Sequence, residues 1–319
     1  MAIIEENSSV DIFEDDINEE IEVKLEDDGE EVSGHMLPLG IALNDSELYR
    51  LSTRKKIKLI YVLGPVDSGK TTFEAMLYAH FLKKIDDEIL FSGSETLVGF
   101  EDRLNSLRTK SGTSDVDMPR TPKDERRTYL HLEVYDKGLK EKFSIVLSDT
   151  SGEAFEESKS NVAYLQQKLP YLDMAERVVL FLDGKSLIDN TLRHNAVNKL
   201  KMLLRTIKSS NLCKSGLKVD IIISKNDCIF EKKDDENAKS FIDNIPNNFA
   251  EFKESYDIKF YRIEAINDFK ITDVNNSTPL IDLIKHWIKE ERFNSCEFSE
   301  LEENTATFIN EFNKYGGRY

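Results

Sequence analysis

The sequence KLIYVLGPVDSGKTTFEA, residues 58–75, contains three kinds of segment in a fixed order. An apolar run rich in β-forming residues, Ile57–Leu63, predicts a strand, and it stops abruptly at Gly64. The octet GPVDSGKT, residues 64–71, then leads into a helical pattern over residues 72–83. A strand, a glycine-containing turn that ends in Lys-Thr, and a helix together predict a phosphate-binding loop.

Each residue type in the octet has a physical role in holding phosphate. Gly64 and Gly69 let the backbone turn tightly, so that successive N–H groups face phosphate oxygens at the positive end of the helix. The Lys70 ammonium adds a point charge near the β- and γ-phosphates, and the Thr71 hydroxyl is a suitable ligand for Mg²⁺. The residues predicted to contact the phosphates are Gly64, Val66, Asp67, Ser68, Gly69, Lys70, Thr71 and Thr72.

Polar residues also follow three later strands. In DTSGE, residues 149–153, the Asp149 carboxylate can hold Mg²⁺ through water, and Gly152 offers a backbone N–H to a γ-phosphate. In SKND, residues 224–227, Asp227 can accept hydrogen bonds from N1–H and the exocyclic amine of guanine, while the Lys225 stem can lie over the base. In EAI, residues 264–266, the N–H of Ala265 is predicted to meet guanine O6. Together these segments predict a site for guanosine triphosphate.

Strands and helices alternate along most of the chain. The predicted strands are 57–63, 89–91, 129–135, 143–147, 177–183, 219–225 and 259–264, and the predicted helices are 72–83, 95–107, 154–169, 192–207, 238–252 and 279–290. We therefore predict an α/β fold with a doubly wound, mostly parallel sheet and helices on both faces. Trp287 is predicted to pack inward, and Arg103 and Arg108 are predicted to lie on the polar side of their helix.

Charge is spread unevenly over the 319 residues. Of the net charge of −17, the first 31 residues carry 14 acidic side chains and the single Lys24. We predict an acidic, partly disordered arm and lead-in over residues 1–56, a nucleotide-binding domain over 57–292 and a C-terminal tail over 293–319. An acidic surface repels nucleic acid, and the sequence has no apolar run long enough to span a membrane. We expect the three cysteines to be reduced thiols, as in the cytoplasm: Cys213, Cys228 and Cys296.

The motifs GPVDSGKT, DTSGE, SKND and EAI, in this order, resemble the translation-factor-like and Ras-like class of P-loop GTPases over roughly residues 57–290. Within that class, the segments GSETLVGFEDR, PRTP and LSDTSGEAFE are most similar to the bacterial double-GTPase proteins predicted to act in conflict and antiphage systems. The resemblance implies a G-domain fold and a GTP-dependent switch. It also implies a companion protein, either a second GTPase or an effector.

Four residues depart from the Ras-like pattern. Val66 stands where Ras-like proteins carry glycine, and its branched side chain would obstruct an incoming arginine finger. Asp67 adds negative charge near the phosphates, and Ser224 replaces an asparagine that braces the phosphate loop. Glu153 stands where glutamine orients the attacking water; a carboxylate can hold water but repels the γ-phosphate, so we expect slow intrinsic hydrolysis.

The first switch requires a threonine between residues 109 and 128. We select Thr121, because Pro119 and Pro122 stiffen its surroundings and Arg120 can supply charge in cis. Thr113 and Thr128 are the alternatives.

The main hypothesis is a cytoplasmic GTPase that hydrolyses GTP to GDP and phosphate and signals to a partner protein in bacterial antiphage defence. Its predicted catalytic residues are Lys70, Glu153 and Thr121, and its predicted Mg²⁺ ligands are Thr71, Thr121 and Asp149. One alternative is a P-loop ATPase or kinase, in which SKND is only a strand end. The other is a non-hydrolysing, nucleotide-bound scaffold, which Val66, Asp67 and Glu153 would suit.

Overall fold

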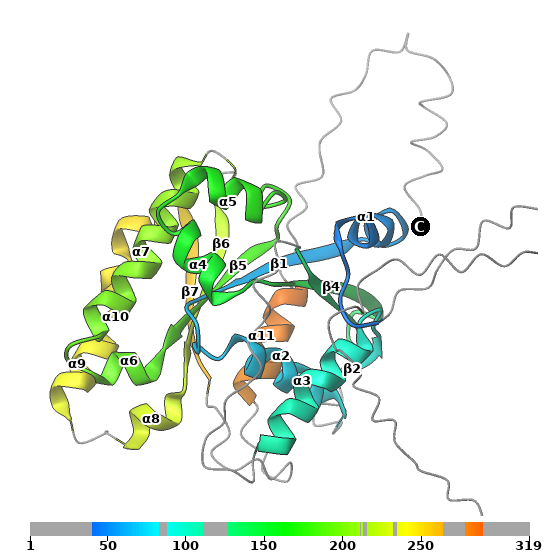
Figure 1. Ribbon diagram of the computed structural model, residues 1–319. Coiled ribbons are helices and arrows are strands. Elements are labelled where there is room, and N and C mark those ends of the chain that lie inside the picture. The colour runs from blue at the N-terminus through cyan, green and yellow to red at the C-terminus, as the bar shows by residue number, and fades with distance from the viewer. Residues whose placement is uncertain are drawn as a thin grey trace, which may run out of the picture. The chain divides into compact units, whose positions relative to one another are not determined.

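The computed structural model describes residues 40–82, 88–110, 127–210, 212, 216–231, 235–263 and 278–289. Figure 1 shows a central sheet with helices packed around it. The strands are β1 (Ile57–Leu63), β2 (Ile89–Gly93), β3 (Tyr129–Asp136), β4 (Glu141–Asp149), β5 (Arg177–Asp183), β6 (Leu217–Ser224) and β7 (Tyr256–Arg262). The helices are α1 (Asp45–Arg54), α2 (Lys70–Leu82), α3 (Leu97–Lys110), α4 (Gly152–Ser158), α5 (Val162–Lys168), α6 (Gly184–Ile188), α7 (Arg193–Ser209), α8 (Asn226–Glu231), α9 (Glu236–Asp243), α10 (Ile245–Asn248), the 3₁₀ helix η1 (Ala250–Phe252) and α11 (Thr278–Lys289).

The seven strands form one sheet in the order β2-β3-β4-β1-β5-β6-β7. The five strands from β4 to β7 pair in parallel, whereas β3 is antiparallel to β4 and β2 is antiparallel to β3. β1 and β5 lie in the middle of the sheet and are buried along almost their whole length, as their continuous apolar sequences predict. The expected mostly parallel sheet is confirmed.

Helices cover both faces of the sheet, which completes the doubly wound arrangement. On one face, α2, α3 and α11 share a buried apolar cluster with alternate residues of β1, β3, β4 and β5, and Trp287 lies in this cluster with 1% exposure. On the other face, α1, α4, α5, α7 and α9 contribute to a second cluster. The inward packing predicted for Trp287 is confirmed. Within the described ranges, no helix has both the length and the apolar character needed to cross a bilayer.

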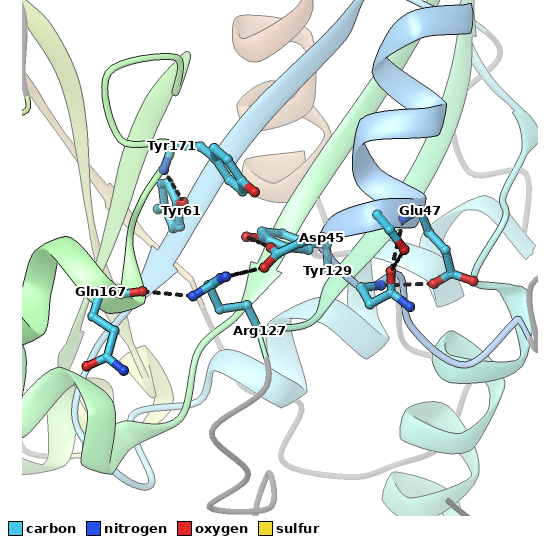
Figure 2. A network of polar contacts seen from close by, with 9 residues as sticks. Asp45, Glu47, Tyr61, Arg127, Tyr129, Gln167 and Tyr171 are labelled. Carbon is cyan, nitrogen blue, oxygen red and sulfur yellow. Dashed lines mark hydrogen bonds and ion pairs between the residues drawn. The ribbon is translucent and has the colours of Figure 1, made fainter. Parts of the chain in front are cut away.

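Helix α1 is fastened to the sheet, as Figure 2 shows. Asn44 and Glu47 form a reciprocal capping box at its N-terminus, with both hydrogen bonds at 2.9 Å. Asp45 then accepts hydrogen bonds from the Arg127 guanidinium and, at 3.2 Å, from the Tyr129 hydroxyl, while Arg127 Nη1 donates to the carbonyl of Gln167 at 3.0 Å. One arginine therefore joins α1, the entry to β3 and the end of α5.

Residues before β1 also belong to the packed core. Leu43, Leu48 and Leu51 are at most 5% exposed and lie in the same apolar cluster as β1 and β5. The described part of the segment 1–56 is thus ordered against the sheet. Most of that segment and all of 293–319 lie outside the described residues, so the three proposed domain boundaries stay predictions.

Two helices predicted as continuous are each divided. The predicted helix 154–169 is two helices, α4 and α5, because the Asn161 side chain caps a new start by accepting from the N–H of Tyr164 at 3.1 Å. The predicted helix 238–252 is α9, α10 and η1. Pro246 in the first turn of α10 has no N–H to continue the ladder from α9. The described range also adds α6 and α8, two helices that the sequence analysis did not predict, and it shows α1 as a regular helix in the lead-in, which the sequence left open as irregular or short helical.

Candidate functional site

The motif residues gather where four neighbouring strands end. The loop 64–69 follows β1, while Asp149, Asp183 and Ser224 are the last residues of β4, β5 and β6. These strands are adjacent and parallel in the sheet, so their carboxyl ends meet at one edge. That edge is where open α/β sheets bind their ligands.

The phosphate loop is held in a tight, specific conformation. Asp67 and Gly69 have φ values of 58° and 91°, in the left-handed region. The Ser68 side chain is buried and donates to the carbonyl of Pro65 at 2.8 Å. A Cβ at Gly64 would lie 2.7 Å from Cβ of Phe181 on β5, so only glycine fits at the start of the turn.

Lys70 begins α2 and reaches back over the loop. Its Nζ donates to the carbonyls of Gly64 at 2.8 Å and Pro65 at 2.9 Å. Burial lowers the pKa of Lys70 to about 8, although the carboxylates of Glu74 and Asp149 favour its charged form. The ammonium is therefore bound to the backbone of the loop.

The segment after β4 lies directly against the phosphate loop. A Cβ at Gly152 would lie 2.4 Å from the backbone N and 2.6 Å from Cα of Val66, so any side chain there would collide with backbone. Gly152 begins α4, and Glu153, half-buried in its first turn, is among the carboxylates near Lys70. The second motif and the phosphate loop are therefore in contact, with Val66 between them.

Asp149 is held by an arginine that the sequence analysis placed wrongly. Arg103 was predicted on the polar side of its helix, yet only 14% of its side chain is exposed. Its Nη2 contacts Asp149 Oδ2 at 2.5 Å, and its Nε contacts Glu74 Oε2 at 3.0 Å. The error arises because both acidic partners come from other elements, which one helix's pattern cannot show. The side chain of Arg108 lies outside the described part.

Glu74 is the most buried charged group at the site, with 2% side-chain exposure. Burial, together with the nearby Asp149 carboxylate, raises the pKa of Glu74 to about 8, against the opposing effect of Arg103. Burial also disfavours the Arg103 cation, but Glu74 and Asp149 outweigh it and raise the pKa of Arg103. Sequence analysis missed Glu74, although its position four residues after Lys70 places both on one face of α2.

The third motif adjoins the phosphate loop from the opposite side. Cβ of Ser224 lies 3.5 Å from the position of a Cβ on Gly69, so the end of β6 touches the loop. Lys225 has a φ of 50°, and its Nζ forms an ion pair with Asp183 Oδ1 at 3.0 Å. Sequence analysis also missed Asp183, which ends a strand as Asp149 does.

Asp227 carries a buried polar atom that suits a base. Its Oδ1 is inaccessible to solvent, and no hydrogen-bond donor within the described residues reaches it. Its Oδ2 is 3.7 Å from the Cys228 thiol, a weak donor. An orphaned carboxylate oxygen is costly unless a ligand satisfies it, and the N–H groups of guanine have the right polarity.

Not every predicted site residue can be located. Thr71 and Thr72 lie half-buried in the first turn of α2, beside Lys70. Thr121 and Ala265 lie outside the described residues, and so do the alternative Thr113 and the loop around it. The roles assigned to all of these residues stay predictions.

The oxygen donors at the site fit a magnesium ion. The Thr71 hydroxyl and the Asp149 carboxylate both belong to the same end of the sheet, and hard oxygen ligands are those that Mg²⁺ prefers. Protein sites usually bind Mg²⁺ through one or two such groups together with substrate phosphates. Thr71 and Asp149 would therefore hold Mg²⁺ in the presence of a nucleotide.

Solved structures with similarity to the chain include GTP-binding proteins. One is the signal recognition particle receptor SRb-GTP/SRX complex from Chaetomium thermophilum, with 14% identity, 68% of this chain and 94% of that chain covered, and a TM-score of 0.37. Another is the ADP-ribosylation factor-like GTP-binding protein, or small COPII coat GTPase SAR1, from Encephalitozoon cuniculi in complex with GDP. The match has 11% identity and a TM-score of 0.33, and it covers 75% of this chain and 81% of that chain. None of the curated proteins compared with the chain matches it.

A family model gives the decisive comparison. The Double-GTPase 2 model matches residues 58–288, which include all three motifs that the structure brings together. The chain is therefore a P-loop GTPase that belongs to the Double-GTPase 2 family.

Proposed function

We propose that this protein is a switch that binds GTP with Mg²⁺ and hydrolyses it to GDP and phosphate. The observation that supports this proposal most directly is the contact of the phosphate loop with both other motifs. Gly152 lies against Val66, and Ser224 lies against Gly69. A triphosphate on the loop would thus meet the second motif at its γ-phosphate and the third motif at its base.

Each residue has a definite part in the proposed reaction. Lys70 leaves the loop carbonyls, and its ammonium stabilises the negative charge that develops on the β- and γ-phosphate oxygens. Glu153 accepts a hydrogen bond from water and directs it in line at the γ-phosphorus, where the new P–O bond forms as the bond to GDP breaks. Thr71 and Asp149 would hold Mg²⁺, which would supply further charge neutralisation, and Thr121 is the proposed first-switch ligand. The charge of Glu153 makes hydrolysis slow.

The nucleotide that the purified protein retains with Mg²⁺ tests this proposal. Chromatography should find GTP or GDP, and GTP but not ATP should displace a fluorescent guanine nucleotide. Retention of ATP would support the ATPase or kinase alternative instead. Phosphate release in a single turnover separates the switch from the scaffold: no release from bound GTP, even with a companion protein, would contradict hydrolysis.

Replacement of Asp227 by asparagine should change the preferred base. An amide at this position presents a donor as well as an acceptor, so it no longer matches the two N–H groups of guanine, but it can pair with the additional carbonyl of xanthine. We expect GTP affinity to fall by roughly 10-fold or more and XTP affinity to rise, as competition binding would measure. Phe230→Ala, which removes an exposed side chain from the same helix, is the matched control and should keep the wild-type preference. An unchanged preference in Asp227→Asn would exclude Asp227 as the base reader.

We further propose that the switch acts in the cytoplasm on a companion protein in bacterial antiphage defence. The support for this role is the resemblance of segments 93–103, 119–122 and 147–156 to double-GTPase proteins of conflict systems. Phage plating on bacteria that carry the gene with its native neighbours tests it. Protection should be lost in the Lys70→Ala variant, and equal plating with and without the wild-type gene across a phage panel would contradict a defence role.

A further inference from the structure

The Arg103 guanidinium contacts three hydrogen-bond acceptors, which lie on three elements of the fold. Its Nη2 contacts Asp149 Oδ2 at 2.5 Å, its Nε contacts Glu74 Oε2 at 3.0 Å, and its Nη1 donates to the carbonyl of Gly99 at 2.9 Å. It projects from α3, which lies beside α2 (Figure 1), toward the carboxyl end of β4. The guanidinium thus connects helix α2, helix α3 and the strand that ends in Asp149.

Glu74 prevents Arg103 from moving away. The Glu74 side chain is 2% exposed, and removal of its partner would leave a buried carboxyl group without the hydrogen bond from Arg103. Breaking such a buried pair by loss of one member is strongly unfavourable. The planar guanidinium also holds its acceptors in a fixed geometry. Arg103 is therefore a fixed support rather than a side chain that swings toward the nucleotide.

Asp149 shares the Arg103 guanidinium with Glu74. Nε of Arg103 is bound to Glu74 and Nη2 to Asp149, so the two carboxyl groups divide the hydrogen-bonding capacity of one guanidinium. Arg103 can then fix the orientation of the Asp149 carboxylate, whose terminal torsion is otherwise broad. Groups that orient metal ligands in this way commonly contribute 10–100-fold to metal affinity.

We propose that Arg103, supported by Glu74, is a positioning residue that orients Asp149 for Mg²⁺-dependent binding of the nucleotide. This inference rests on the proposed function, because it takes Asp149 to be a ligand of nucleotide-bound Mg²⁺. It assigns a role in metal binding to α3, a helix that carries none of the nucleotide-binding motifs.

The test compares the affinity for a fluorescent GDP analogue in excess Mg²⁺ with that in EDTA. In the wild type, Mg²⁺ should tighten binding. In Arg103→Met, we expect this tightening to fall by roughly 10–100-fold, with the affinity in EDTA nearly unchanged. Arg205→Met is the control, because it removes an arginine of an exposed ion pair with Glu251 that involves no residue of the three motifs. Its Mg²⁺ effect should equal that of the wild type.

A second variant removes the risk that Arg103→Met unfolds the protein. The double variant Glu74→Met/Arg103→Met replaces the buried pair with two apolar side chains, which is often neutral or stabilising. It should fold and still show the reduced Mg²⁺ effect. A folded double variant with the full Mg²⁺ effect would overturn this inference alone. A wild type that binds the analogue equally with and without Mg²⁺ would instead contradict the proposed function.

Discussion

Lys70→Ala is expected to lose nearly all affinity for GTP while it keeps its fold. In the structure, Lys70 Nζ is bound to the carbonyls of Gly64 and Pro65, and both bonds can be exchanged for phosphate oxygens. A hydrogen bond to a charged group contributes about 1.5–3 kcal/mol. The loss of two such bonds should weaken GTP binding by roughly 100-fold or more, as calorimetry or fluorescence titration would measure.

The fold should tolerate this change, because Lys70 sits in the first turn of α2 and contacts the backbone of its own loop. Thermal unfolding without nucleotide should therefore be similar in the variant and the wild type. Lys239→Ala, which removes an exposed lysine from α9, is the matched control and should bind GTP normally. Wild-type GTP affinity in Lys70→Ala would exclude the octet 64–71 as the phosphate site.

The sequence predicted the sheet well, because its central strands are buried on both faces. β1 and β5 match the predicted ranges residue for residue, and β6 begins two residues earlier than expected. Helix ends were less predictable. The break at Asn161 depends on a single side-chain cap within a continuous amphipathic pattern. Helix α1 packs Leu48 and Leu51 into the core and pairs Asp45 with Arg127, a residue far away in the chain.

The candidate site was predictable where its residues belong to a motif next to a strand end, whereas Asp183, Glu74 and Arg103, which belong to no motif, were missed. Gly152 and Ser224 were identified from their positions at strand ends, and the structure places both against the phosphate loop. Arg103 was not, because its partners Glu74 and Asp149 are 29 and 46 positions away in the chain. A single sequence shows that a helix contains a charged residue, but it does not show which distant charged group lies beside that residue in the fold and makes its burial favourable.

A buried polar network holds α11 on the face of the sheet that α2 and α3 also cover. Arg177 on β5 is 0% exposed, and its Nη1 donates to Asp220 Oδ2 on β6 at 2.6 Å. The same oxygen accepts from Trp287 Nε1 of α11 at 2.8 Å. Lys58 of β1 supports this helix further, because its Nζ donates to the carbonyls of Trp287 and Ile288. Asp220 is thus the shared acceptor of a buried cation and a buried indole.

Asp220→Ala should therefore produce the largest loss of stability among single changes in this network. It removes the carboxylate that Nη1 of the buried Arg177 contacts, and breaking a buried pair in this way costs about 3–5 kcal/mol. Asp220→Asn should lose less, because the amide oxygen can still accept from Trp287. Denaturant unfolding would measure both, with Asp243→Ala as the control, since its exposed ion pair with Arg262 contributes little. If Asp220→Ala unfolded at the wild-type denaturant midpoint, the network would not be what secures α11 to the sheet.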